Sequence, residues 1–169
     1  MRIGIALGSN LEDRLLHLRI ASELLLPLHE PSEPLLSSRI YETLPVDCPE
    51  DSLPFLNAAI ELSSSLPPLA LLERLLSIER QLGRPADHPY HAPRTIDLDL
   101  LYCDDIEVSH ESLTLPHPRI SERLFVLKPL ADICPERVLP RRCCGIRVMC
   151  ETLQAQRGGA DVQLFACSF

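Results

Sequence analysis

Apolar residues recur along this chain with two different periods, and each period predicts a type of secondary structure. In "TIDLDLL" (95–101) every second residue is apolar, which is the period of a strand with one buried face. The segment "RIGIAL" (2–7) predicts a buried first strand. "LLSSRIYET" (35–43) and "FLNAAIELS" (55–63) have the β-branched and apolar character of two more strands.

A spacing of three or four residues between apolar positions predicts two helices. The first covers about 11–25, and Ser9 or Asn10 can cap its start. The second follows the prolines at 67–68 and ends at Gly83. Its apolar face is formed by Leu71, Leu75, Ile78 and Leu82.

The order strand, helix, strand, strand, helix, strand predicts an α+β fold with a ferredoxin-like βαββαβ sheet and its helices on one face. Extra short strands follow, and a helix begins near Ser121. We expect one domain over 1–142 and a loosely ordered tail of unknown role over 143–169. The proline-containing stretches 44–54 and 83–93 predict long loops.

Composition indicates an ordinary globular protein. Hydrophobic residues make up 46% and charged residues 24% of 169 positions. No apolar run is long enough for a membrane span, and the apolar stretch at the N-terminus is too short for a secretory signal. A net charge of −8 argues against a broad nucleic-acid surface. We therefore expect a cytoplasmic location and neither a nucleic-acid nor a membrane partner. As separate expectations, the protein is a monomer and its ligands are small molecules.

The seven cysteines predict reduced thiols, because their number is odd and the domain is large enough to fold without disulfides. The cluster "CCGIRVMC" (143–150) suggests zinc at first sight, but a second half-site with paired spacing is missing. Metal binding there is the less favoured hypothesis.

Asp97 and Asp99 are the most informative polar residues. Side chains two residues apart on a strand project from one face, roughly 6.6 Å apart along it. Two unpaired carboxylates on a buried strand repel each other and carry a desolvation cost, which a bound Mg²⁺ would remove. Arg94, at the entrance of the strand, could then neutralise a polyphosphate. The alternative is a solvated strand face on which Arg94 forms an ion pair with these aspartates.

Five sequence blocks extend this hypothesis. Together they resemble the 6-hydroxymethyl-7,8-dihydropterin pyrophosphokinases of folate biosynthesis, in order and over about 1–140. The blocks are "ALGSNL" (6–11), "FLNAAIEL" (55–62), "IERQLGR" (78–84), "APRTIDLDLL" (92–101) and "LTLPHPRISERLFVLKPLADICPE" (113–136). The resemblance implies transfer of the β,γ-pyrophosphoryl group of ATP to the pterin hydroxymethyl oxygen, with release of AMP and with two Mg²⁺ ions.

The resemblance also assigns roles to individual residues. The catalytic set would be Arg84, Arg94, Asp97 and Asp99, of which the two aspartates hold both magnesium ions. Contacts with ATP would come from Glu79, Arg84, Arg94, Thr114, His117 and Arg123. The pterin would be bound by Gly8, Thr43, Pro45, Val46, Phe55, Asn57, Asp97 and Phe125. Among these, Asn57 would read the pterin edge, and the two phenylalanines would sandwich the ring.

The sequence departs from the best-studied family pattern on the nucleotide side. Ala86, Tyr90, His91 and Ser112 stand where that pattern has arginine or tryptophan. ATP could be held more weakly, or Tyr90 and His91 could stack in place of the tryptophan. Two other functions stay open: a non-catalytic nucleotide- or metal-binding module, and one part of a larger folate assembly whose partner docks on the tail. In the family, the loops 44–54 and 83–93 would close over substrate as lids.

Overall fold

One six-stranded sheet organises the molecule. The computed structural model describes residues 1–44, 53–84, 94–157 and 162–169. Five strands lie in the order β5-β1-β4-β3-β8, and β2 pairs with β4 beside this path. Every pairing is antiparallel. The strands are β1 (Arg2–Ser9), β2 (Leu36–Ser37), β3 (Ile40–Thr43), β4 (Phe55–Ser63), β5 (Asp97–Cys103) and β8 (Val162–Ala166).

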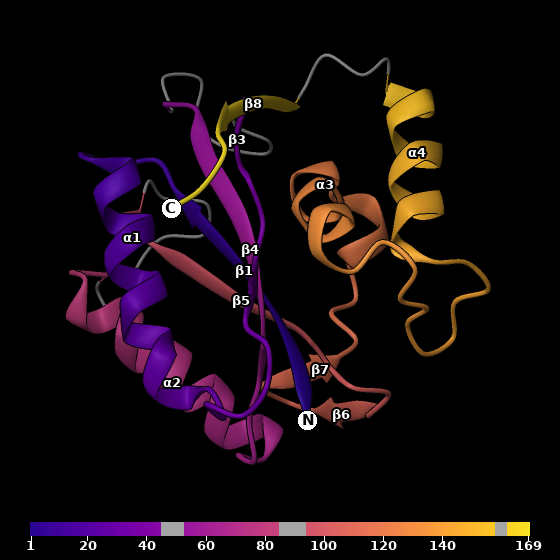
Figure 1. Ribbon diagram of the computed structural model, residues 1–169, viewed down its shortest axis with the longest axis horizontal. Coiled ribbons are helices and arrows are strands. Elements are labelled where there is room, and N and C mark those ends of the chain that lie inside the picture. Colours follow the sequence, from indigo (N-terminus) through magenta and orange to yellow (C-terminus); the bar gives the residue numbers. More distant parts are fainter. Residues whose placement is uncertain (45–52, 85–93, 158–161) are drawn as a thin grey trace.

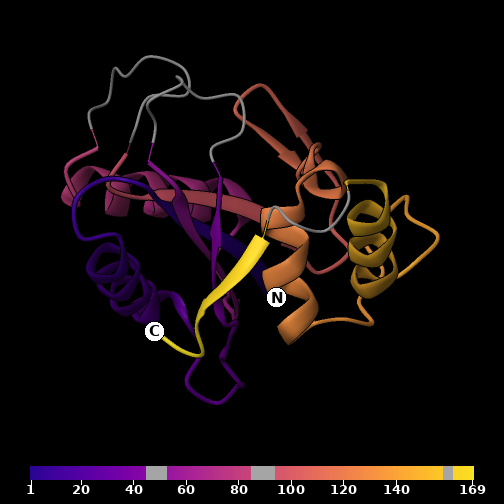
Figure 2. The same ribbon diagram turned by 90° about the horizontal axis from the view of Figure 1, so that it is seen from above.

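Helices cover both faces of the sheet. On one face lie α1 (Arg14–Leu25), which the short helix η1 (Leu26–Leu28) continues, and α2 (Pro68–Gln81). On the other lies α3 (Leu124–Ile133), and α4 (Ile146–Arg157) packs against the side of α3 that faces away from the sheet, as Figure 1 and Figure 2 show. The mixture of helices with an antiparallel sheet is confirmed. The prediction of helices on one face is correct for α1 and α2 and wrong for the C-terminal pair, because β4 is buried at every position and needs cover on both sides.

The first strand separates the two cores by alternating large and small residues. Ile3, Ile5 and Leu7 belong to the core under α1 and α2. The residues between them, Gly4, Ala6 and Gly8, face the side of α3. A Cβ on Gly4 would overlap the ring of Tyr102, so glycine is required where this ring crosses β1. Small residues on one face of β1 therefore leave room above the middle of the sheet.

The start of α1 corrects one expectation. Its N-cap is Asp13, whose side chain accepts a hydrogen bond from the backbone N–H of Leu16 at 3.0 Å. The helix begins later than the apolar spacing indicated, and Ser9 and Asn10 are not its caps. Both of these side chains are buried instead.

The C-terminal third contains the predicted short elements. A turn at 104–105 leads to the two-stranded sheet of β6 (Val108–His110) and β7 (Leu113–Leu115), and η2 (Ile120–Glu122) precedes α3. The expected loose tail after residue 142 is wrong. In α4, Ile146, Met149 and Cys150 are buried in the core that α3 shares, and β8 extends the sheet beside β3.

The cysteines in the described part of the chain are all free. Within the "CCGIRVMC" cluster, Cys150 is buried, Cys144 is half-buried and Cys143 is exposed, so the three thiols lie in different environments. Among the described residues no three His, Cys, Asp or Glu side chains form a group that could hold a metal ion. No helix in these residues has both the length and the apolar character that crossing a membrane requires.

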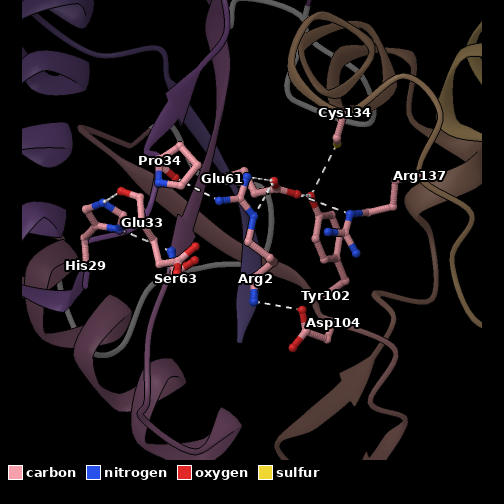
Figure 3. Close-up of polar contacts among 10 residues, drawn as sticks. All are labelled: Arg2, His29, Glu33, Pro34, Glu61, Ser63, Tyr102, Asp104, Cys134 and Arg137. Carbon is pink, nitrogen blue, oxygen red and sulfur yellow. Dashed lines mark hydrogen bonds and ion pairs between the residues drawn. The ribbon is translucent and has the colours of Figure 1, made fainter. Parts of the chain in front are cut away.

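A buried charge cluster ties the ends of three strands to the segment after α3 (Figure 3). The Glu61 side chain is only 3% exposed, and its carboxylate accepts hydrogen bonds from Arg2 Nε at 3.0 Å and from the hydroxyl of Tyr102. Arg137 Nε lies 3.2 Å from the same carboxylate, and its guanidinium lies 4.7 Å above the Tyr102 ring. The Tyr102 hydroxyl also contacts Cys134 Sγ at 3.3 Å. Each charge in this cluster has a protein partner.

Removing the central carboxylate should destabilise the fold strongly. Glu61→Ala leaves two partly buried guanidinium groups without their anion, and we expect the free energy of unfolding to fall by about 3–5 kcal/mol. Urea denaturation followed by circular dichroism measures this change. The matched control is Glu136→Ala, which removes an exposed ion pair with Arg147 and should leave the unfolding free energy nearly unchanged. Equal effects of the two substitutions would show that the buried cluster does not hold the strands together.

Candidate active site

The pairing register of β1 brings polar residues of its two neighbours, β4 and β5, into one row across it. Gly8 lies opposite Asn57 of β4 and opposite Asp97 of β5. Ala6 lies opposite Asp99 in the next row. A Cβ built on Gly8 would lie 3.5 Å from Asn57 Oδ1 and 3.9 Å from the Asp97 Cβ, in ordinary van der Waals contact. Gly8 therefore forms the floor of a hollow between an amide and a carboxylate.

This hollow is the first of two pockets that share the aspartates, and we call it the first pocket. It contains each described residue to which the resemblance gives a pterin contact; Pro45 and Val46 lie outside the described residues. Asn57 is buried and its Nδ2 donates to Thr43 Oγ1 at 2.9 Å, so β3 orients the amide. The lining is formed by Ala6, Leu7, Gly8, Thr43, Leu44, Phe55, Asn57, Arg94, Asp97, Asp99 and Phe125.

The second pocket lies between α2, β5 and the segment after β6. It contains four of the residues assigned to ATP, namely Glu79, Arg84, Thr114 and His117, together with Asp97 and Asp99. Ser112, which stands where the family pattern has an arginine, also lines it, and its hydroxyl lies 2.8 Å from His110 Nδ1. The Asp97–Asp99 pair thus lies where the two pockets meet.

Arginines surround the two aspartates. Asp97 is paired with Arg84 through Oδ1 and with Arg94 through Oδ2, the latter at 3.1 Å. Asp99 Oδ2 accepts a hydrogen bond from Arg123 Nη1 at 2.9 Å. Each aspartate therefore has an arginine partner, and Arg94 forms the ion pair that the alternative reading of the sequence expected.

Glu79 adds a third carboxylate on the α2 side. It pairs with Arg84, and its Oε1 accepts a hydrogen bond from the backbone N–H of Leu98 at 2.7 Å. Burial nevertheless dominates its environment and raises the pKa of Glu79 to about 7.

Burial also shifts the titration of Asp99, which lines both pockets, and of His117, which lines the second. It raises the pKa of Asp99 above its usual range, and the nearby charge of Asp97 raises it further. Burial lowers the pKa of His117, against the attraction of Asp99, so the neutral imidazole is favoured. Asp97 and Asp99 are two neighbouring, partly buried carboxylates, and a divalent cation is stabilising at such a place. The donor set, two same-face carboxylates, fits a hard cation with oxygen ligands.

Sequence reasoning missed Asn10 as a residue of this site. Its Oδ1 accepts a hydrogen bond from the backbone N–H of Arg94 at 2.8 Å, and its own N–H donates to the Arg94 carbonyl at 3.2 Å. This exchange fixes Arg94, whose guanidinium lies 5.5 Å above the Phe55 ring. The signal was the asparagine that directly follows the first strand, which the sequence analysis interpreted as a helix cap. Arg94 Nε is buried and has no hydrogen-bond partner among the described residues, so it can still receive an acceptor.

Three of the residues that depart from the family pattern, Ala86, Tyr90 and His91, lie outside the described residues, as do most of the two predicted lid loops. The predictions on stacking and closure therefore stay predictions.

Comparison with known proteins identifies a family with these features. The family model for 7,8-dihydro-6-hydroxymethylpterin-pyrophosphokinase (HPPK) matches residues 4–135. A 2-amino-4-hydroxy-6-hydroxymethyldihydropteridine pyrophosphokinase of Bacillus subtilis is 47% identical, over 78% of this chain and 77% of that protein. The protein of the same name from Methylorubrum extorquens is 41% identical, over 82% of this chain and 85% of its own.

Longer relatives and solved structures match as well. A folate synthesis bifunctional protein of Chlamydia caviae is 39% identical over 80% of this chain, which spans only 31% of that protein. The crystal structure of an HPPK-DHPS in complex with substrates superposes on 94% of this chain and 44% of its own, with a TM-score of 0.69. A Plasmodium falciparum HPPK-DHPS with pteroate gives a TM-score of 0.71. At 15% identity, both structures show similarity of fold alone.

Protonation of Glu79 should make stability depend on pH. Because burial raises its pKa from 4.5 to about 7, the folded protein keeps a proton that the unfolded chain loses. The retained proton contributes to the free energy of unfolding, and this stabilisation is fully present below about pH 4.5 and is lost as the pH rises through about 7. Relative to Glu79→Gln, we expect the wild type to lose about 1–3 kcal/mol of unfolding free energy between pH 5 and pH 8.

Urea denaturation at several pH values measures this difference. Glu73→Gln, an exposed position on the same helix, is the control and should show no such trend. A difference between wild type and Glu79→Gln that does not vary with pH would contradict the raised pKa.

Proposed function

The chain belongs to the HPPK family, and from this premise we propose that it transfers pyrophosphate from ATP to the hydroxymethyl group of 6-hydroxymethyl-7,8-dihydropterin, releasing AMP, in tetrahydrofolate biosynthesis. The observation that carries the proposal is the junction of two pockets at Asp97 and Asp99. Transfer of a pyrophosphoryl group requires one substrate on each side of the groups that neutralise its charge.

The first pocket has the chemistry of a pterin site. Asn57 offers a carboxamide, which can pair with the adjacent donors and acceptors of a pterin edge, and Thr43 fixes its orientation at 2.9 Å. Phe55 and Phe125 supply aromatic surface for the ring, and the missing side chain of Gly8 leaves space for it. In the proposal, Pro45 and Val46 complete this side of the site.

The second pocket has the chemistry of a nucleotide polyphosphate site. Arg84 lines this pocket, Arg94 lines the first pocket, and Arg123 pairs with Asp99 where the two pockets meet. These three arginines would bind and orient the phosphates, since a guanidinium fork matches phosphate oxygens in pairs. His117 and Thr114 also line the second pocket and would add polar contacts, and Glu79 would hold Arg84 in place.

We further propose that Asp97 and Asp99 hold two Mg²⁺ ions, as the resemblance implies. When bound, such ions neutralise phosphate charge and align the reacting oxygens for in-line displacement. The arginines that now pair with the aspartates could then turn to the polyphosphate. For this displacement the protein has to position the two substrates and neutralise charge. The proposal includes no covalent nucleophile and no named general base.

Other parts of the assignment belong to the same proposal. Residues 1–142 would carry the activity, and the strand order β5-β1-β4-β3 with its two crossover helices supports a ferredoxin-like assignment for them. The cytoplasmic location, the monomeric state and the absence of nucleic-acid or membrane partners are likewise proposed. The loops 44–54 and 83–93 would exclude water when both substrates are bound, as the family resemblance implies.

The test of the proposed function is pterin-dependent release of AMP. We expect the wild type to form AMP from ATP only when Mg²⁺ and 6-hydroxymethyl-7,8-dihydropterin are both present. Asp97→Ala and Asp99→Ala should each reduce the rate by at least about 100-fold, because each removes a charged group from the reacting centre. Asp105→Ala, in the turn beyond β5, is the matched control and should keep the rate.

Two outcomes would oppose the proposal. Calorimetric binding of ATP without AMP formation by the wild type would favour the non-catalytic nucleotide-binding module. Undiminished turnover in both aspartate variants would remove the metal role from these residues.

Two glycines on β1 allow pocket shape to be separated from fold stability. A Cβ on Gly8 makes only ordinary contacts with the protein but enters the first pocket, so Gly8→Ala should raise the KM for the pterin with little change in thermal stability. A Cβ on Gly4 overlaps the Tyr102 ring, so Gly4→Ala should cost about 1–3 kcal/mol of unfolding free energy. Thermal melts and steady-state kinetics measure the two effects. A stability loss in Gly8→Ala as large as that in Gly4→Ala would contradict this description of the pocket floor.

A further inference from the structure

The strand β8 lies beyond the residues that the family model matches, yet it contacts a wall of the first pocket. It pairs with β3 so that Val162 lies opposite Thr43 and Gln163 lies opposite Glu42. Thr43 both lines the first pocket and accepts the hydrogen bond that orients Asn57. After β8 the chain runs toward α1, where Phe169 is half-buried against the core (Figure 1 and Figure 2).

A second contact joins β8 to the other wall of this pocket. The Phe165 ring lies 5.9 Å from the guanidinium carbon of Arg14, at the start of α1. Arg14 Nη1 donates to Glu42 Oε1 and to the carbonyl oxygen of Pro54, both at 2.8 Å. Pro54 directly precedes Phe55, which lines the first pocket, and Glu42 directly precedes Thr43.

Arg14 therefore holds together the end of β3 and the start of β4. These are the described residues on each side of the segment 45–52. Its side chain is 23% exposed, and the aromatic ring of Phe165 covers part of it, which favours the guanidinium in this one position. Asn10, four residues before Arg14, contacts the residues that lead into β4, since its Nδ2 donates to the Leu53 carbonyl at 3.5 Å.

We propose that Arg14 is a positioning residue for the pterin side of the site and that the C-terminal strand β8, through Phe165 and its ladder with β3, keeps it in place. The inference rests on the proposed function for the identity of the ligand. Arg14 lines neither pocket, and in this proposal it acts by holding Thr43 and Phe55 at the separation that the pterin needs. The tail thus has a role in substrate binding.

The experiment compares the KM for the pterin with the KM for ATP in the full-length protein. For Phe165→Ala we expect the pterin KM to rise about two- to fivefold, the range expected from one exposed cation–π contact, with the ATP KM unchanged. For Arg14→Met, which removes both hydrogen bonds, the rise should be about tenfold. In Phe165→Trp the pterin KM should stay at the wild-type value, because the indole also offers an aromatic face to the guanidinium.

Two controls separate positioning from general stability. Leu164→Ala changes the neighbouring residue of β8, which is similarly exposed and lies opposite Tyr41, and it should leave both KM values unchanged. In the Arg14→Met background, Phe165→Ala should have no further effect, because Phe165 acts through Arg14. Equal changes in the two KM values, a Phe165→Ala effect no larger than that of Leu164→Ala, or additive effects in the double variant would each overturn the proposal.

A readout without turnover keeps this test independent of the proposed function. Amide hydrogen exchange at 40–43 and 53–57 should be faster in Phe165→Ala than in Leu164→Ala. If the wild type releases no AMP, the proposed function fails, and the exchange rates still decide whether β8 orders the pocket walls. Unchanged exchange in Phe165→Ala would overturn the positioning role.

Discussion

The register of β1 between β4 and β5 is the constraint on which the rest of the structure depends. Side chains alternate between the two faces along a strand. A slip of β4 or β5 by one residue against β1 would therefore turn Asn57 or Asp97 into the core under α1 and α2. The register is fixed by residue size. Ile3, Ile5 and Leu7 fill that core, whereas the alternate positions are glycine or alanine, so only one pairing both fills the core and leaves the pocket open. The same alternation thus produces the fold and the floor of the site.

The two ends of these strands use buried charge in opposite ways. At one end Glu61 receives Arg2, Arg137 and the Tyr102 hydroxyl, and the cluster is complete without a ligand. At the other end the carboxylates also have arginine partners, but burial and mutual repulsion still raise the pKa of Asp99, and Arg94 Nε has no partner among the described residues. Charges that protein partners satisfy incompletely are available to a ligand, and they lie where the two pockets meet. The first cluster stabilises the fold, and the second is organised for binding.

Sequence periodicity predicted what depends on local pattern, and it failed where a residue's role depends on distant partners. The strands predicted at 2–7, 55–63 and 95–101, which the structure contains as β1, β4 and β5, the two crossover helices and the same-face aspartates all follow from local sequence pattern. The second helical layer and the role of Asn10 depend on contacts between segments far apart in the chain. The helix α4 could have been predicted from the sequence, since its apolar residues Ile146, Met149, Cys150 and Leu153 have helical spacing. The individual site residues came from the family resemblance, because no periodicity distinguishes Asn57 or His117 from other polar residues.

The position of β3 explains why an additional strand at this edge matters for binding. With only four residues, β3 would be a short edge strand that frays easily, although it carries a wall of the first pocket. Pairing with β8 makes it an interior strand with neighbours on both sides. A wall that is ordered before the ligand arrives spares the complex the entropy cost of ordering it on binding. The segment that the family model does not match therefore stabilises the part of the matched domain that local sequence holds least firmly.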